Sequence, residues 1–144
     1  MSNLFDAVAQ VYDLIQVLPV TTLLDGRIYQ NRMPTIGEEI GEGRDRFIVI
    51  GNLEPNIYSD QLLKEIPINI SVFCKELDYS LPDVTMLDLI EKAIDTALDD
   101  KTNYNTQVGY TGVSKVFSHI LSENPFSKKH TLMVIRINLI INRK

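Results

Sequence analysis

The 144-residue sequence contains a single cysteine, Cys74, and no tryptophan. One cysteine excludes a disulfide within the chain and a metal site built from cysteines alone. No apolar run approaches about 18 residues, the length of a membrane-spanning helix, so we expect no membrane partner. No basic segment followed by an apolar stretch stands near the beginning, so nothing suggests a signal peptide. These absences predict a protein of a reducing compartment.

The composition is otherwise that of an ordinary globular protein. Hydrophobic residues make up 44% of the chain and charged residues 23%, which excludes disorder along its whole length. A chain of this size can bury a hydrophobic core without disulfides. We therefore expect one domain spanning residues 1–144.

Acidic residues are nearly missing from the last third of the sequence. Residues 101–144 carry seven basic side chains and one acidic side chain, a net charge of +6. Residues 1–100 carry seven basic and eighteen acidic side chains, a net charge of −11. Such asymmetry is typical of a subunit whose surfaces attract other copies, or of a chain with a nucleic-acid-binding tail. It can also disappear once the folded chain brings its two ends together.

Hydrophobic periodicity predicts two main helices and five strands. The first helix is marked by one apolar stripe, formed by Val8, Val11, Ile15 and Leu18. Pro19 is expected to end this helix. Alternation or β-branched content predicts strands at residues 27–33, 47–50, 66–76, 113–121 and 131–141. The order of these elements predicts an α+β fold with a mostly antiparallel sheet and two main helices packed on one face.

The second helix has the clearest signals in the sequence. Thr85 and Asp88 form the pattern of a capping box at its start. Its apolar stripe predicts a face packed on the core. Its other side carries four carboxylates, Asp88, Glu91, Asp95 and Asp99. Carboxylates at this spacing usually form a solvated face, although the same pattern could be taken for an acid–base or metal site.

Residues 35–46 differ in composition from their surroundings. Three glycines and six charged residues fall within these twelve positions, which predicts a long, flexible connection. The glycines alternate with glutamates that would repel phosphate, so a phosphate-binding loop is excluded. We interpret the segment as an interaction loop, and a hairpin tip without function is the alternative. The candidate contact residues are Gly37, Glu38, Glu39, Ile40, Gly41, Glu42, Gly43 and Arg44.

No group of residues suggests catalysis, a metal site or a cofactor. His119 and His130 lack the partners of a zinc motif, and we expect both at the surface or at the rim of the core. Cys74 belongs to the apolar face of its strand, so we expect a buried thiol rather than a nucleophile. The sequence therefore predicts neither an enzyme nor a cofactor-binding protein. The alternative is a small nuclease or hydrolase that uses the helix carboxylates.

Five landmarks in a fixed order carry a resemblance to a known family. They are the strand ending in proline at Arg27–Pro34, the apolar strand Phe47–Ile50, the alternating strand Pro67–Lys75, the acidic amphipathic helix Val84–Leu98 and the long closing strand Thr131–Ile141. This order resembles the tail-completion or tail-terminator family of long-tailed bacteriophages, and is similar to the lambda-type tail terminator. The resemblance extends over nearly the whole chain, and the segment from Arg27 to Pro34 matches best.

The resemblance implies a structural virion protein that acts by binding alone. Members of the family form a ring, usually a homohexamer, that completes the tail tube and joins it to the head connector. The implied partners are further copies of the chain, the tail tube protein and the head–tail connector protein, while DNA passes through the lumen without specific binding. The implied location is the tail or neck of the virion, assembled in the host cytoplasm. A connector-side neck adaptor and a small DNA-binding adaptor are the alternatives.

The basic third supplies candidate charges for contacts between subunits. Lys128 and Lys129 stand together before the last predicted strand. In a ring of identical subunits, a basic surface on one copy can meet an acidic surface on the next. We therefore expect these two lysines at the subunit interface.

Overall fold

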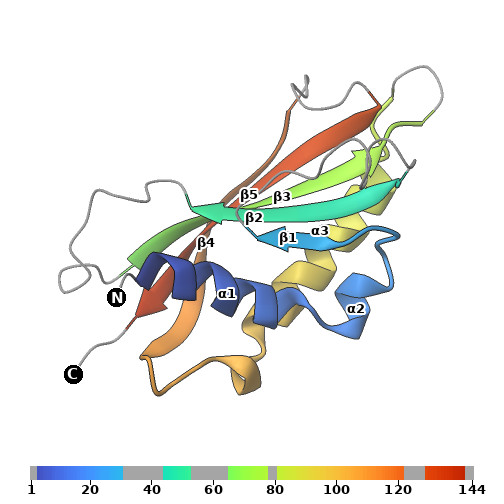
Figure 1. Ribbon diagram of the computed structural model, residues 1–144. Helices are drawn as coiled ribbons and strands as arrows, with labels where there is room; N and C mark the ends of the chain where they lie inside the picture. Colours follow the sequence, from blue (N-terminus) through green and yellow to red (C-terminus); the bar gives the residue numbers. More distant parts are fainter. Residues whose placement is uncertain (1–2, 31–43, 53–64, 78–80, 122–128, 142–144) are drawn as a thin grey trace.

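The computed structural model describes residues 3–30, 44–52, 65–77, 81–121 and 129–141. Within these ranges the chain forms helices and strands in the order expected from the sequence, with two short helices added (Figure 1). The elements are α1 (Asn3–Ile15), α2 (Leu18–Thr21), β1 (Ile28–Gln30), β2 (Arg46–Asn52), β3 (Glu65–Lys75), α3 (Val84–Asp99), the 3₁₀ helix η3 (Lys101–Asn103), β4 (Tyr110–Leu121) and β5 (His130–Ile141).

The five strands form one sheet in the order β1-β2-β3-β5-β4. β1 and β2 are parallel, and every other neighbouring pair is antiparallel. β3 is the central strand, with Ile70 opposite Ile50 of β2 on one side and Ile135 of β5 on the other. The predicted α+β fold with a mostly antiparallel sheet is confirmed.

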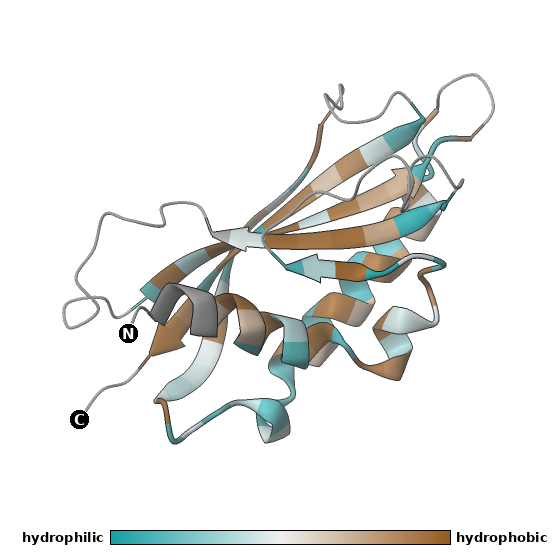
Figure 2. Cartoon of the chain, viewed as in Figure 1, coloured by the Kyte–Doolittle hydropathy of each residue, from teal (hydrophilic) through white to brown (hydrophobic). Residues whose placement is uncertain are grey.

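Both main helices lie on the same face of the sheet. α1 contacts β1, β2 and β3, while α3 contacts β3 and β4. Alternate residues of the strands point toward these helices and form the main core, as the period-two pattern predicts. Figure 2 shows the apolar bands that run along the central strands and the neighbouring helices. Fully buried members include Val11, Ile48, Ile70, Ile90 and Ile135.

The opposite face of the sheet carries a second apolar cluster, which the sequence did not indicate. Its buried members are Tyr29, Phe47, Phe73 and Leu132. The rings of Phe47 and Phe73 stack with centroids 4.7 Å apart. Phe73 is on the face that alternation assigns to polar residues, yet only 1% of its surface is exposed. Aromatic side chains from neighbouring strands therefore build a small core of their own here.

The first helix ends earlier than predicted. α1 stops at Ile15, and Pro19 lies in the first turn of α2 rather than beyond the end of one long helix. Proline is tolerated there because the first turn has no intrahelical acceptor for its missing N–H. The break rotates Leu18 away from the stripe of Val8 and Val11, and its side chain is 76% exposed. The prediction of Leu18 as a core residue was wrong.

The second helix begins one residue before the predicted capping box. Asp83 is the N-cap of α3, and its Oδ1 accepts a hydrogen bond of 3.1 Å from the backbone N–H of Met86. The assignment of Thr85 and Asp88 as a capping box was therefore wrong, since α3 already includes Thr85. Asp is as good an N-cap as Ser or Thr, so the preceding carboxylate satisfies the helix end.

β4 is longer than predicted and irregular. It begins at Tyr110, three residues before the predicted strand, and its pairing with β5 shifts twice, between Tyr110 and Gly112 and between Lys115 and Phe117. The second shift leaves Val116 without a partner position in β5, which is the geometry of a β-bulge. A bulge interrupts the alternation of faces, which explains why the sequence pattern is blurred over this strand.

Candidate interaction site

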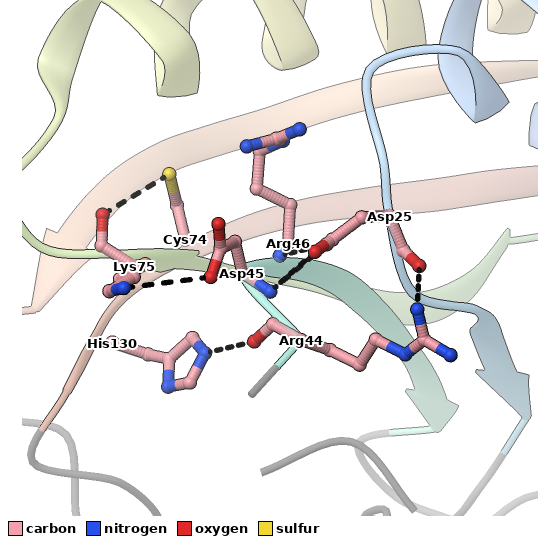
Figure 3. A network of polar contacts seen from close by, with 7 residues as sticks. All are labelled: Asp25, Arg44, Asp45, Arg46, Cys74, Lys75 and His130. Atoms are coloured by element: carbon pink, nitrogen blue, oxygen red, sulfur yellow. Dashed lines mark hydrogen bonds and ion pairs between the residues drawn. The ribbon is translucent and has the colours of Figure 1, made fainter. Parts of the chain in front are cut away.

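Two predicted interaction features meet at one end of the sheet. Gly37–Gly43 and Lys128 lie outside the described residues, but Arg44 and Lys129 are described. The backbone carbonyl of Arg44 accepts a hydrogen bond of 2.8 Å with Nε2 of His130, the residue after Lys129. Contacts between positions 86 apart in the sequence thus join the end of the predicted loop to the start of β5 (Figure 3).

Asp25 is the centre of this arrangement. Its carboxylate accepts hydrogen bonds from the backbone N–H of Asp45, at 2.9 and 3.0 Å, and from that of Arg46, at 2.7 Å. The turn before β1 is thereby clamped to the residues that begin β2. We call the set Asp25, Arg44, Asp45, Arg46, Lys75 and His130 the root network, because it holds the point at which the predicted loop enters β2.

The arginines of the root network reinforce the same contact. Nη1 of Arg44 lies 3.4 Å from the carbonyl oxygen of Asp25, and Nε of Arg46 donates to the carbonyl of Leu23. Lys75 contacts Asp45 at 3.9 Å. Both of these side chains are substantially exposed, so this ion pair contributes little to stability. The backbone hydrogen bonds to Asp25 therefore dominate the network.

The environment of Asp25 favours its charged form. Partial burial alone would raise the pKa, but the N–H groups of Asp45 and Arg46 and the charge of the Arg46 guanidinium outweigh it. The pKa of Asp25 is therefore lowered from its ordinary value of 3.8. The clamp thus remains ionised throughout the neutral and mildly acidic range.

The Asp25 clamp predicts a specific dependence of stability on pH. Because the folded-state pKa is depressed, the carboxylate's contribution is complete above the unfolded-state value and is lost as pH falls through the folded value, below 3.8. We expect the stability difference between the wild type and Asp25→Asn to be constant from pH 5 to 7, because this range lies above both the folded-state and the unfolded-state pKa. The difference should shrink below pH 4. Urea unfolding at each pH measures it. An equal difference at pH 3 and pH 7 would contradict this assignment.

His130 is buried, so its predicted place at the surface was wrong. It is 5% exposed, and its ring lies against Phe47 with centroids 5.5 Å apart. The hydrogen bond to the carbonyl of Arg44 explains how a polar ring is accommodated there. His119 is exposed on β4, as expected, and its ring is nearly perpendicular to that of Phe117, with centroids 6.4 Å apart. His130 differs from His119 by its contacts with Arg44 and Phe47, which are distant in the sequence. A single sequence contains no signal for such contacts.

Cys74 is buried on the helix-facing side of β3, as predicted. Burial, together with the negative charge of Asp83, raises the pKa of the Cys74 thiol to about 11. The reactive thiolate is therefore scarce at neutral pH. The chemistry of this side chain is that of a small core residue.

The carboxylates of α3 are not simply a solvated face. Lys115 of β4 forms ion pairs with Glu91 and with Asp95, the latter at 3.1 Å. Asp88 pairs with Lys92 on its own helix at 2.9 Å. A lysine of the basic third thus neutralises carboxylates of the acidic part within one subunit. Part of the charge asymmetry in the sequence is accordingly satisfied inside the fold.

Among the residues that the structure describes, no group of three or more histidine, cysteine, aspartate or glutamate side chains could hold a metal ion. In the same described ranges, no helix is long and apolar enough to cross a membrane. The root network is built from the backbone hydrogen bonds to Asp25, the Asp45–Lys75 ion pair and the hydrogen bond between His130 and Arg44.

Comparison with known proteins identifies a shared fold. No protein-family model matches the chain, and no curated protein matches it. Among solved structures, the chain is similar to that of the gp17 protein of bacteriophage SPP1, with a TM-score of 0.55 and 15% sequence identity. The similarity covers 94% of this chain and 87% of the SPP1 protein. At this identity it shows that the two chains share a fold.

Proposed function

We propose that this chain is a structural virion protein of a tailed bacteriophage. In this role, identical copies form a ring that completes the tail tube and joins it to the head connector. A homohexamer is the expected stoichiometry, with the tube protein on one side and the connector on the other. DNA passes through the lumen without specific binding, and the ring belongs to the tail or neck of the virion.

The observation that carries this proposal is the shared fold with a bacteriophage protein over nearly the whole chain. The resemblance of the sequence landmarks to tail-completion proteins supports the same assignment. The landmarks coincide with structural elements: the alternating strand is β3, the acidic helix is α3 and the closing strand is β5. The tail-side role in particular rests on the sequence resemblance.

The described side chains also support a role in binding rather than catalysis. The Cys74 thiol is buried with a raised pKa. His130 is hydrogen-bonded to a backbone carbonyl, and two of the α3 carboxylates are paired with Lys115. These four side chains, each of a type that can act as nucleophile, base or acid, are thus engaged in the fold. We therefore propose that the protein has no enzymatic activity.

Ring formation is tested directly with purified protein. Light scattering and negative-stain images of the chain, alone and with tail tube protein, should show closed rings with a central opening. A chain that stays monomeric at high concentration, and is unaffected by tube protein, would overturn the proposal. Binding measured separately to tube protein and to connector protein distinguishes a tail-side ring from a connector-side neck adaptor.

A DNA-binding adaptor predicts a different result. DNA affinity would then fall steeply with salt and require Lys128 and Lys129, because phosphate contacts release counterions. The ring proposal predicts weak DNA binding that these substitutions leave unchanged. Electrophoretic shift assays across a salt series decide between the two.

Charge reversal at Lys128 and Lys129 is expected to weaken assembly without unfolding the chain. Lys129 is exposed at the end of the sheet that carries the root network, and its carbonyl accepts a hydrogen bond from Glu76. We expect Lys128→Glu with Lys129→Glu to raise the dissociation constant between subunits about tenfold at low salt, and less at high salt. Sedimentation velocity measures it, with Lys92→Glu on α3 as a control for a single charge reversal elsewhere on the surface. A dissociation constant that changes neither with the charge reversal nor with the salt concentration would show that these lysines lie outside the interface.

A further inference from the structure

A cleft of about 350 Å³ lies between α1, α2 and the start of β1, and its volume is within the usual range of ligand-binding pockets. Leu24 and Ile28 supply apolar lining. The lining contains no acidic residue, and it includes four side chains that can donate hydrogen bonds: Tyr12, Gln16, Thr21 and Arg27. A cleft with hydrogen-bond donors and a positive charge, but no carboxylate, favours an anionic group as its occupant.

The guanidinium of Arg27 is exposed and has no partner among the residues that the structure describes. Arg44 and Arg46, by contrast, contact backbone carbonyls. The carboxylate nearest along the chain, that of Asp25, already accepts hydrogen bonds from the backbone N–H groups of the root network. Arg27 therefore keeps its planar set of donors available beside the cleft, and this geometry matches a carboxylate.

β1 has a free edge beside the same cleft. It is an outermost strand of the sheet, and β2 is its one neighbouring strand in the described part of the chain (Figure 1). The backbone N–H of Ile48 donates to the carbonyl of Arg27, and Ile48 is the register partner of Ile28. In a parallel pair, the backbone groups of alternate residues face the neighbouring strand, so those of Arg27 and Tyr29 face β2. The N–H and C=O of Ile28 and Gln30 therefore point to the free edge, where an extended segment of another chain can pair with them.

We propose that an extended segment of a partner protein adds to β1 and places an acidic side chain in the cleft. Paired residues of adjacent strands point their side chains to the same face of the sheet. Ile28 packs against the main core on the helix side. The partner residue opposite Ile28 therefore directs its side chain toward the cleft, where a carboxylate meets the guanidinium of Arg27.

The alternation of an added strand also specifies the neighbouring residues of the partner segment. The residues before and after the acidic one point to the opposite face, beside Tyr29 of the second apolar cluster. The recognised segment is therefore extended, with an acidic residue between two apolar residues. β1 offers only two outward-facing residues to main-chain pairing, so the contact with Arg27 provides most of the selectivity.

Two capped peptides test this inference with the whole protein. One has the sequence Thr-Val-Glu-Val-Thr, and its twin has glutamine in place of the glutamate. Titration at low salt, followed by NMR of the isotope-labelled protein, should show the glutamate peptide binding about tenfold or more tightly than its twin, because a hydrogen bond to a charged group is the stronger one. Amide exchange at Ile28 should slow when the glutamate peptide is bound, since its N–H then pairs with the added strand.

Arg27→Gln separates the side-chain contact from the main-chain pairing. This variant should bind both peptides equally, and no better than the wild type binds the glutamine peptide. Lys92→Gln is the control, because it removes an exposed positive charge from α3 instead. It should keep the preference for glutamate. Circular dichroism and thermal melting verify that both variants are folded.

Several results would overturn the inference. They are failure of the glutamate peptide to bind at millimolar concentration, a preference that survives Arg27→Gln, and binding that leaves amide exchange at Ile28 unchanged. Acetate and inorganic phosphate test the competing occupant, a free anion. If either one displaces the glutamate peptide at equal concentration, the cleft is a site for small anions and strand addition is wrong.

The outcome is independent of the proposed ring. If the wild type forms rings but does not bind the glutamate peptide, this inference fails and the ring proposal stands. If the wild type stays monomeric with and without tube protein, yet binds the peptide through Arg27, the ring proposal fails and this inference stands.

Discussion

Phe47→Ala is expected to lower the free energy of unfolding by about 3–5 kcal/mol, the usual cost of truncating a fully buried phenylalanine. Phe47 has no exposed surface, and its ring stacks on Phe73 and meets Tyr29 edge-on. Truncation therefore removes buried apolar surface, these two contacts and the ring contact with His130, and leaves a cavity. Typical domains have a total stability of about 5–15 kcal/mol, so the loss is a large share of it. Urea unfolding followed by circular dichroism measures it.

Phe117→Ala is the matched control for this prediction. Phe117 belongs to the same sheet but is 38% exposed, and Arg136 lies over its ring with the guanidinium carbon 4.9 Å from the centroid. An exposed cation–π contact contributes about 0.5–1 kcal/mol, so the expected loss is about 1 kcal/mol. Equal losses for Phe47→Ala and Phe117→Ala would show that the second cluster is not a core.

Phe47 also connects the second cluster to the root network. Its ring contacts His130, whose Nε2 bonds to the carbonyl of Arg44. The clamp at Asp25 is thus backed by a buried aromatic cluster rather than by exposed ion pairs. A partner that contacts the predicted loop would therefore act on a rigid attachment point.

A helix or strand can be predicted from the sequence when the residues that determine it lie within the same segment. β3 and β5 are evident in the sequence because strict alternation along one strand records which face is buried. The sequence predicts only part of β4, because the bulge at Val116 breaks the alternation of apolar and polar residues along this strand. The predicted first helix is too long because Leu18 continues the helical spacing of Val8, Val11 and Ile15 in the sequence. The chain turns between Ile15 and Leu18, and a helical repeat contains no information about that turn.

The root network lay beyond sequence reasoning for a different reason. Its contacts join Asp25 to Asp45, 20 positions away, and Arg44 to His130, 86 positions away. Such partners are set by the strand order, which places the start of β2 beside the end of β3, and the end of β3 beside the start of β5. Composition could mark Arg44 and Lys129 as candidates, but only the topology brings their segments together.

Gln10 provides a further connection between helix and strand. It lies in α1, is 5% exposed, and uses both ends of its amide. Nε2 donates to the carbonyl of Asn103 at 3.0 Å, and Oε1 accepts from the backbone N–H of Asn105 at 2.6 Å. One side chain thus satisfies two backbone groups of the segment that leads into β4. The sequence pattern alone would count this residue as a polar position on the first helix.

Gln10→Ala is expected to lower the free energy of unfolding by about 2–6 kcal/mol, because two partly buried backbone groups lose their partner and each costs about 1–3 kcal/mol. Gln10→Met is the matched control: it restores the side-chain volume but neither hydrogen bond, so its loss should be nearly as large. Denaturant unfolding gives both values, and amide exchange at Asn105 should accelerate in both variants. If Gln10→Met were as stable as the wild type, the effect of Gln10→Ala would be assigned to packing instead. If the hydrogen bonds dominate, faster exchange should also reach Tyr110, whose backbone N–H donates to the carbonyl of Asn105 at the start of β4.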